Sequence, residues 1–278
     1  MGGASRVVVF VSLSFSLAYA IDLAFYLSRV DIFPLFALPR MFTPLLAVAL
    51  TLALSGQPIL EGLRGYGFKW SPSCLKWAAV GLALPFMVYA VGVTYALALD
   101  LPIYNPAVLV FRSLGLTPPL DPYLLLAAFL ALGALAGATL NAAVALGEEI
   151  GWRGLMLDEL RLRVGFWTSA IAAGVVWALW HAPLILFFGY NYPEQRLLGL
   201  ATYVALCVLW SVMMSILKLK SGSVVPSSVM HGTMNALAGL MLYTVLVNRL
   251  VGLPVGALSI AASATVLLAW LAAWRMRP

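Results

Sequence analysis

Long apolar runs separated by short charged segments constrain this chain more than any other feature. Of its 278 residues, 63% are hydrophobic and only 9% are charged. An α-helix needs about 20 apolar residues to cross about 30 Å of hydrocarbon, whereas the strands of a membrane barrel are about 10 residues long and alternate in polarity. The sequence therefore predicts an all-α fold, a polytopic transmembrane helix bundle of about eight spans.

The predicted spans differ in how clearly they are delimited. The second is short, and three prolines interrupt residues 34–44. A cleaved signal peptide is the alternative for the first, because Arg6 precedes it and residues 18–20 resemble a cleavage site, but its apolar run continues to Leu27. The spans are expected at about residues 7–27, 41–55, 75–99, 123–149, 166–189, 197–217, 226–248 and 253–274.

Basic residues predict the orientation. Eight spans place both termini on one side, and the sixteen Lys and Arg then divide into eleven on that side and five, Arg40 among them, on the other. Cytoplasmic segments are enriched in Lys and Arg, so we predict cytoplasmic termini and location in the plasma membrane. Span ends and anionic lipid headgroups account for the net charge of +6, which gives no nucleic-acid signal. With no internal repeat or separate soluble region, residues 1–278 are expected to form a single integral membrane domain.

Carboxylates at membrane depth are candidates for function because they are costly there. Glu149 and Arg153 are spaced i, i+4 with the acid first, which predicts an ion pair. Glu148 points about 100° away and has no partner in its own helix, so we interpret it as a candidate general base. The alternative is that these residues mark the cytoplasmic end of a span. Asp22 has no partner by spacing, and we interpret it as part of a hydrogen bond between helices.

Both histidines fall within apolar spans. His231 is i, i+4 with Asn235, so one helix face presents two possible hydrogen-bond donors. Pro183 cannot donate to the Leu179 carbonyl, which predicts a kink and a free polar group near His181. Each histidine alone could be a buried imidazole bonded to a neighbouring helix. Cys74 and Cys207 have no paired spacing, so neither a disulfide framework nor a thiolate zinc site is expected.

Spacing links Glu148 to His181. The two are symmetric about residues 164–165, and the polar break and glycine of residues 163–165 predict a turn there, so two helical arms would bring them to similar depth. Sixteen helical residues rise about 24 Å, so a shallow site requires tilted arms or a 153–163 stretch that lies along the interface.

Three motifs occur in order on three spans: Glu-Glu-x-x-x-Arg, aromatic-x-x-x-His and His-x-x-x-Asn. This order resembles the CAAX protease and bacteriocin-processing (CPBP) family of intramembrane endopeptidases, which includes the type II CAAX prenyl endopeptidases. The resemblance covers about residues 123–248, a family-like catalytic core, and Trp177 stands where the family usually has Phe. It implies a glutamic endopeptidase that needs no cofactor, in which Glu148 and His181 activate water, His231 and Asn235 form an oxyanion hole, and Glu149 and Arg153 support the site.

The partners implied are membrane lipids and a peptide or membrane-protein substrate, with or without a lipid, and C-terminal CAAX-type processing is one such reaction. One alternative is a zinc-dependent protease with Glu148, His181 and His231 as ligands, although the sequence has no His-Glu-x-x-His. The other is a non-enzymatic membrane protein, either an immunity or scaffold protein or a proton-coupled transporter.

Overall fold

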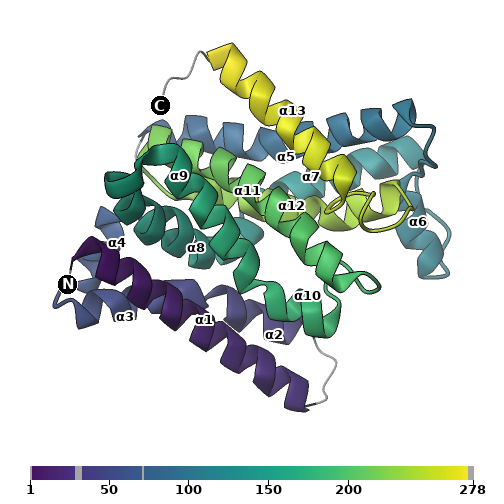
Figure 1. Ribbon diagram of the computed structural model, residues 1–278. Helices are drawn as coiled ribbons and strands as arrows, with labels where there is room; N and C mark the ends of the chain where they lie inside the picture. Colours follow the sequence, from purple (N-terminus) through teal and green to yellow (C-terminus); the bar gives the residue numbers. More distant parts are fainter. Residues whose placement is uncertain (1, 29–32, 71, 275–278) are drawn as a thin grey trace.

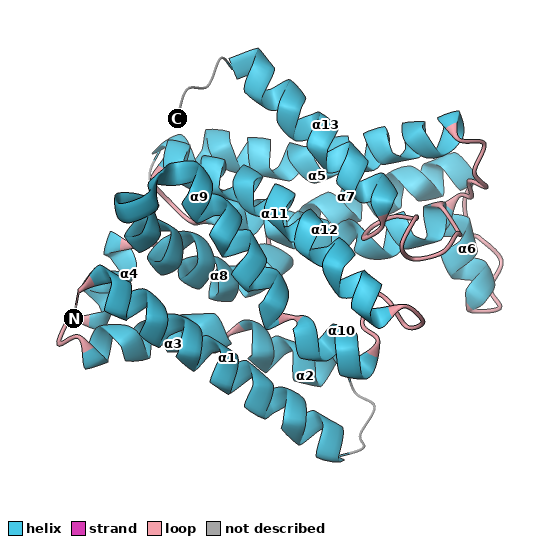
Figure 2. Cartoon of the chain, viewed as in Figure 1, coloured by secondary structure: helices cyan, strands magenta, loops and turns pink. Residues whose placement is uncertain are grey.

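The computed structural model describes residues 2–28, 33–70 and 72–274, in which helices are joined by turns and loops (Figures 1 and 2). The one extended pairing in these ranges is an isolated antiparallel bridge between Ile103 and Val245. The predicted all-α fold is therefore confirmed. The helices are α1 (Gly3–Ser28), α2 (Phe33–Met41), α3 (Thr43–Leu54), α4 (Ile59–Gly65), α5 (Pro72–Ala98), α6 (Pro106–Ser113), α7 (Pro122–Ala138), α8 (Leu140–Glu149), the π-helix η1 (Ile150–Met156), α9 (Leu157–Trp180), α10 (Ala182–Phe188), α11 (Arg196–Ser221), α12 (Val225–Thr244) and α13 (Ala257–Trp274).

The predicted apolar runs lie mainly in helices, although residues 245–248 and 253–256 at the ends of two runs are not helical. The helical segments differ in length. Within the described ranges, five are long and apolar enough to cross a membrane: Gly3–Ser28, Phe36–Leu54, Pro72–Ala98, Leu140–Phe188 and Arg196–Ser221. Pro122–Ala138 and Ala257–Ala273 are apolar but shorter. This length and composition are those of an integral membrane protein. The number of eight spans and the cytoplasmic termini remain predictions.

Helix breaks lie where the sequence predicted them. Residues 34–44 are divided between α2 and α3, with a break at Phe42. Gly165 has a φ of 75° inside α9, a left-handed conformation that glycine adopts at little cost, and it forms the expected turn of residues 163–165. Near Pro183 the helix ends at Trp180 and resumes at Ala182. These breaks place His181 at the junction of two helices.

Close packing of α12 against α7 and α8 brings two of the three motifs together. A Cβ atom on Gly232 would lie 2.4 Å from the backbone nitrogen of Ala142, and one on Gly137 would lie 2.6 Å from the Cα of Thr233. The backbones are therefore in near contact, as small residues allow between membrane helices. This contact places His231 beside the end of α8.

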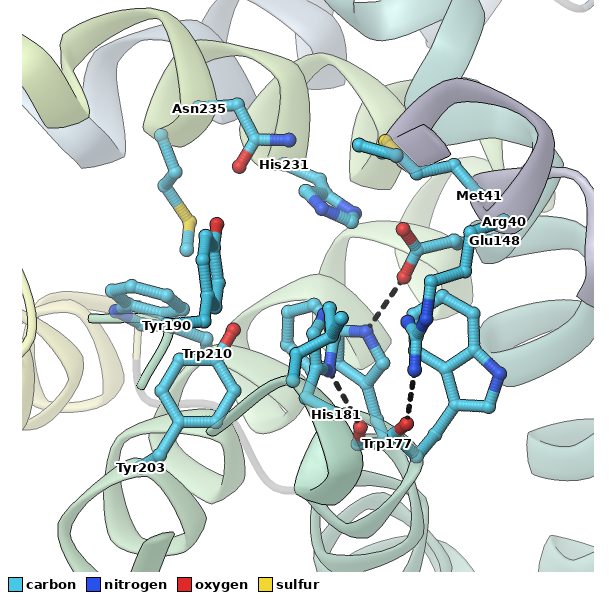
Figure 3. Close-up of a pocket in the computed structure, with 14 residues that line it drawn as sticks. Arg40, Met41, Glu148, Trp177, His181, Tyr190, Tyr203, Trp210, His231 and Asn235 are labelled. Atoms are coloured by element: carbon cyan, nitrogen blue, oxygen red, sulfur yellow. Dashed lines mark hydrogen bonds between the residues drawn. The ribbon is translucent and has the colours of Figure 1, made fainter. Parts of the chain in front are cut away.

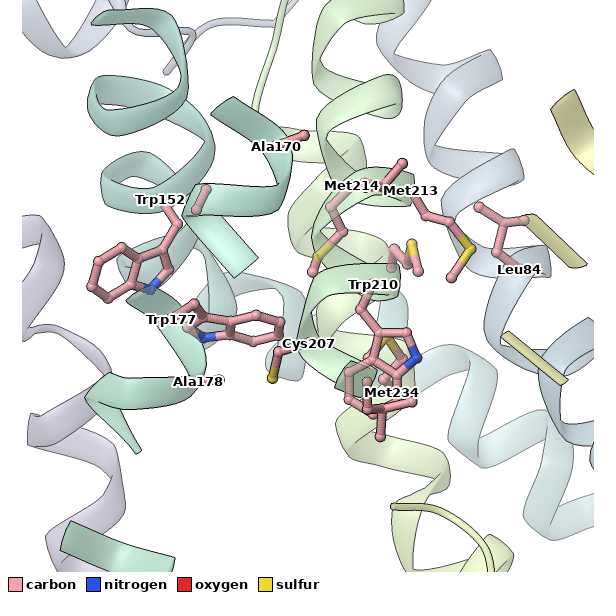
Figure 4. Close-up of a cluster of buried hydrophobic side chains, with 14 of the residues drawn as sticks. Leu84, Trp152, Ala170, Trp177, Ala178, Cys207, Trp210, Met213, Met214 and Met234 are labelled. Carbon is pink, nitrogen blue, oxygen red and sulfur yellow. The ribbon is translucent and has the colours of Figure 1, made fainter. Parts of the chain in front are cut away.

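The interior next to the site is filled by large apolar side chains from α9, α11 and α12 (Figure 4). Trp177 on α9 lies near Cys207 and Trp210 on α11, with Met213 and Met214 one turn further along α11. The indole nitrogen of Trp210 donates to the hydroxyl of Ser263 on α13 at 3.1 Å. Cys74 and Cys207 are both buried, and neither forms a disulfide. This core forms one wall of the cavity that Glu148 and His181 line.

Candidate active site

One cavity of about 90 Å³ is lined by all four residues that were predicted to carry chemistry (Figure 3). Glu148 comes from the end of α8, His181 from the junction of α9 and α10, and His231 and Asn235 from α12. Since a water molecule occupies about 30 Å³ of liquid, the cavity has room for more than one. Residues from three separate helical segments thus converge on a space that can hold water.

Only one of the two carboxylate oxygens of Glu148 accepts a hydrogen bond from the described part of the chain. Its side chain is 1% exposed, and Oε2 accepts a hydrogen bond from the indole nitrogen of Trp177 at 2.8 Å. Oε1 has no hydrogen bond to the described part of the chain, and the free oxygen faces the side of the cavity where His231 lies (Figure 3). The π-helix η1 begins directly after Glu149, and such wide turns are frequent at functional sites. The arrangement leaves a carboxylate oxygen available to accept a proton from water.

His181 is oriented by its own helix. Its Nδ1 lies 2.9 Å from the backbone carbonyl oxygen of Trp177. That carbonyl is available because the His181 backbone N–H bonds to the Ala178 carbonyl instead. A carbonyl only accepts, so Nδ1 carries the proton, and in the neutral ring Nε2 keeps a free lone pair. A neutral His181 can therefore accept a proton at Nε2.

The predicted effect of Pro183 is confirmed, with partners from two other helices. The Leu179 carbonyl accepts a hydrogen bond from the Tyr19 hydroxyl on α1 at 2.9 Å. The next carbonyl, of Trp180, accepts one from the guanidinium of Arg40 on α2. The free end of α9 is thus bound by side chains of the first two helices, which fixes the position of His181.

Glu149, Arg153 and His231 form a buried group beside the cavity. Glu149 Oε1 accepts from Arg153 Nη1 at 2.9 Å, which confirms the predicted ion pair, and it also lies 2.9 Å from His231 Nδ1. The carboxylate holds the proton on Nδ1, so Nε2 of His231 is a donor only when the ring carries a second proton. An oxyanion role for His231 therefore requires the imidazolium form, with Glu149 as its counter-ion.

Arg40 was counted among the basic residues at the membrane surface, and this interpretation was wrong. Its side chain is 2% exposed and lines the cavity. Its Nε lies 2.8 Å from Asp22 Oδ1, and its guanidinium lies 3.7 Å from the centroid of the Trp180 ring. The predicted interhelical hydrogen bond of Asp22 is confirmed, with Arg40 as its partner. The sequence does contain a signal for this pair, because Asp22 and Arg40 are an acid and a base that each lie in an apolar segment without a charged neighbour. Buried charges are normally paired, so two such residues are expected to contact each other.

Three aromatic residues that line the cavity, Tyr190, Tyr203 and Trp210, were not predicted from the sequence. Tyr190 follows Gly189, which ends α10 with a left-handed φ of 69°. Tyr203 contacts the His181 ring at a centroid distance of 5.3 Å. No spacing rule identifies such residues, because they belong to a loop and to a helix that carries no motif.

The arrangement gives no support to the zinc alternative. Among the residues that the structure describes, no three His, Cys, Asp or Glu side chains lie close enough together to hold a metal ion. A catalytic zinc site normally has three protein ligands, and the proposed set was Glu148, His181 and His231. The cavity that these residues line also contains the cation of Arg40.

The fold and the site together define an integral membrane protein with a buried carboxylate and two imidazoles around a cavity that can hold water. Residues 124–237 match a family model described as Rce1-like, type II CAAX prenyl endopeptidase. A 38-residue segment is 47% identical to CAAX prenyl protease 2 of Methanococcus maripaludis, which is 14% of this chain and 14% of that protein. The predicted family resemblance is thus confirmed over residues 124–237. This range contains Glu148, Glu149, Arg153, His181, His231 and Asn235.

Proposed function

We propose that this protein is an intramembrane endopeptidase of the glutamic type, built as a single integral membrane domain over residues 1–278. The observation that carries the proposal is the convergence of Glu148, His181, His231 and Asn235 on one cavity. The Rce1-like match over residues 124–237 supports it independently.

The proposed mechanism uses the two free acceptors and the two donors of the cavity. A water molecule, oriented by His181 Nε2, gives a proton to Glu148, and its oxygen bonds to the substrate carbonyl carbon. The amide of Asn235 and the Nε2–H of protonated His231 donate to the resulting oxyanion. Glu148 then returns the proton to the amide nitrogen as the C–N bond breaks, which leaves a carboxylic acid and an amine.

The proposed substrate is a membrane-associated peptide or protein that is processed near its C-terminus in the plasma membrane. The matched family is described as a type II CAAX prenyl endopeptidase and the matched relative is named a CAAX prenyl protease. A farnesylated CAAX peptide is therefore the first substrate to test. Because the matched segment spans only 14% of that relative, the substrate class is a proposal that a cleavage assay tests.

The test uses the full chain in liposomes with a fluorescence-quenched, farnesylated CAAX peptide. We expect cleavage by the wild type, and at least a thousandfold loss in Glu148→Gln and in His181→Ala because each removes the group that takes or directs the proton of water. Cleavage that persists in excess phenanthroline supports the glutamic mechanism. Loss with chelator that zinc restores would favour the metal alternative instead. Weak effects of both substitutions would overturn the proposal. It would also be overturned if the wild type cleaves nothing and has a binding or transport function that Glu148→Gln leaves intact.

A further inference from the structure

Trp177 contacts both members of the proposed water-activating pair through different atoms. It lies on α9 one turn before His181, and its side chain is 1% exposed. The indole nitrogen donates to Glu148 Oε2 at 2.8 Å, and the backbone carbonyl accepts from His181 Nδ1 at 2.9 Å. Figure 3 shows both bonds on the same side of the cavity.

The indole ring is itself held in place. The guanidinium carbon of Arg153 lies 4.5 Å from the ring centroid, and the His231 ring meets it edge-on with centroids 5.2 Å apart. A cation over the face of an indole and an aromatic edge against it are both favourable contacts. The direction of the N–H bond is therefore fixed by the neighbours of the ring.

Glu148 depends on this donor. Its side chain has three rotatable bonds, and within the ranges that the structure describes it accepts no other hydrogen bond. Without the donor, the carboxylate can turn and present either oxygen, or neither, to the cavity. Catalytic groups that lose their fixed geometry by about 1 Å lose on the order of a hundredfold in rate.

We propose that Trp177 is a positioning residue whose indole N–H holds Oε2 of Glu148 and thereby keeps Oε1 directed at the attacking water. This inference rests on the proposed function and adds a residue to it. A phenyl ring at this position would fill much of the same space but would have no N–H. The resembling family usually has Phe here and so lacks this donor, which makes the hydrogen bond a feature of this chain, where it is the only one that Glu148 accepts within the described ranges.

The kinetic test compares two replacements of Trp177 in the reconstituted full chain with the farnesylated CAAX peptide. Trp177→Phe removes the N–H and reduces the ring, whereas β-(3-benzothienyl)alanine at position 177 replaces only the N–H by sulfur. We expect kcat to fall about ten- to a hundredfold in both, with KM unchanged, because one hydrogen bond to a charged acceptor is lost. Trp167→Phe, in the same helix but exposed, is the matched control and should keep its kcat.

A second readout does not depend on cleavage. The ultraviolet resonance Raman difference between wild type and Trp177→Phe isolates the Trp177 indole, whose N–H vibration reports hydrogen bonding. We expect a hydrogen-bonded band in the wild type, its shift to the free position in Glu148→Ala, and its retention in Glu148→Gln, which keeps an acceptor oxygen.

The outcomes separate this inference from the proposed function. An unchanged kcat in the benzothienyl variant would overturn the inference, and so would an unchanged band in Glu148→Ala. If Trp177→Phe does not fold, the benzothienyl variant decides, because it keeps the volume of the indole. If the wild type cleaves no peptide, the proposed function fails, while the band still decides whether Trp177 holds Glu148.

Discussion

Asp22 on α1 and Arg40 on α2 form an ion pair inside the bundle, with Arg40 Nε 2.8 Å from Asp22 Oδ1. The side chain of Arg40 is 2% exposed and that of Asp22 is 4% exposed. The same guanidinium donates to the Trp180 carbonyl, one residue before His181. The N-terminal helices, which lie outside the matched range of residues 124–237, are thereby joined to a residue of the proposed site.

We predict that Asp22→Ala destabilises the protein by about 3–5 kcal/mol, because it leaves the Arg40 cation buried without a counter-ion. Asp22→Ala combined with Arg40→Met should restore much of the stability, since no charge then remains. Unfolding of the purified variants in mixed micelles, followed by circular dichroism, measures the difference. A single variant as stable as the wild type would show that the pair is open to water.

A second prediction concerns the contact between α12 and α8. Gly232→Ala should lower both stability and activity, because its Cβ would lie 2.4 Å from the backbone nitrogen of Ala142, and α12 would have to move with His231. Gly239→Ala is a matched control in the same helix, where a Cβ meets nothing within 4 Å. We expect it to be neutral or to stabilise by about 0.5–1 kcal/mol, since alanine favours a helix. Thermal unfolding and peptide cleavage measure the two effects, and equal behaviour of the two variants would contradict the close approach.

Side-chain contacts within one helix could be predicted from the sequence, whereas contacts between helices could not. The pair Glu149–Arg153 follows from helical spacing alone, and the structure confirms it. The contacts of Trp177 with Glu148 and of His231 with Glu149 join residues 29 and 82 positions apart, so they depend on how helices pack. The π-helix after Glu149, over Ile150–Met156, was not predicted from the sequence.

Proline and glycine residues made it possible to predict where helices break. Gly165 and Pro183 each predicted a break at the right place, because one tolerates a positive φ and the other lacks an N–H. The partners of the freed carbonyls, Tyr19 and Arg40, lie more than a hundred residues away. Local chemistry thus predicted that a polar group would be free, whereas only the packed bundle determines which side chain binds it.

Asn235 offers a near-isosteric test of the oxyanion role. In Asn235→Asp an N–H donor is replaced by a carboxylate oxygen, which would repel the developing negative charge. We expect kcat to fall by at least about a hundredfold, in line with the loss of a single oxyanion donor in other acyl-transfer enzymes. Thermal unfolding should change little, because Asn235 is exposed to the cavity. Steady-state kinetics with the peptide substrate provide the measurement, and a loss confined to KM would instead indicate substrate binding.

Tyr66, in the segment that follows α4 and outside the apolar spans, provides a pH-dependent prediction. Its hydroxyl donates to Glu159 at 2.6 Å and accepts from Arg6 at 2.9 Å, so it joins the start of α1 to α9. Burial, together with the hydrogen bond to Glu159, raises the pKa of Tyr66 to about 12. Because the folded state favours the neutral phenol, its contribution to stability is complete below the usual pKa of about 10 and is lost as the pH rises towards 12. The melting temperature of the wild type should therefore fall between pH 10 and 12 more steeply than that of Tyr66→Phe, which has no proton to lose. Parallel curves for the two proteins across this range would show that the phenol ionises as freely in the folded protein as in the unfolded chain.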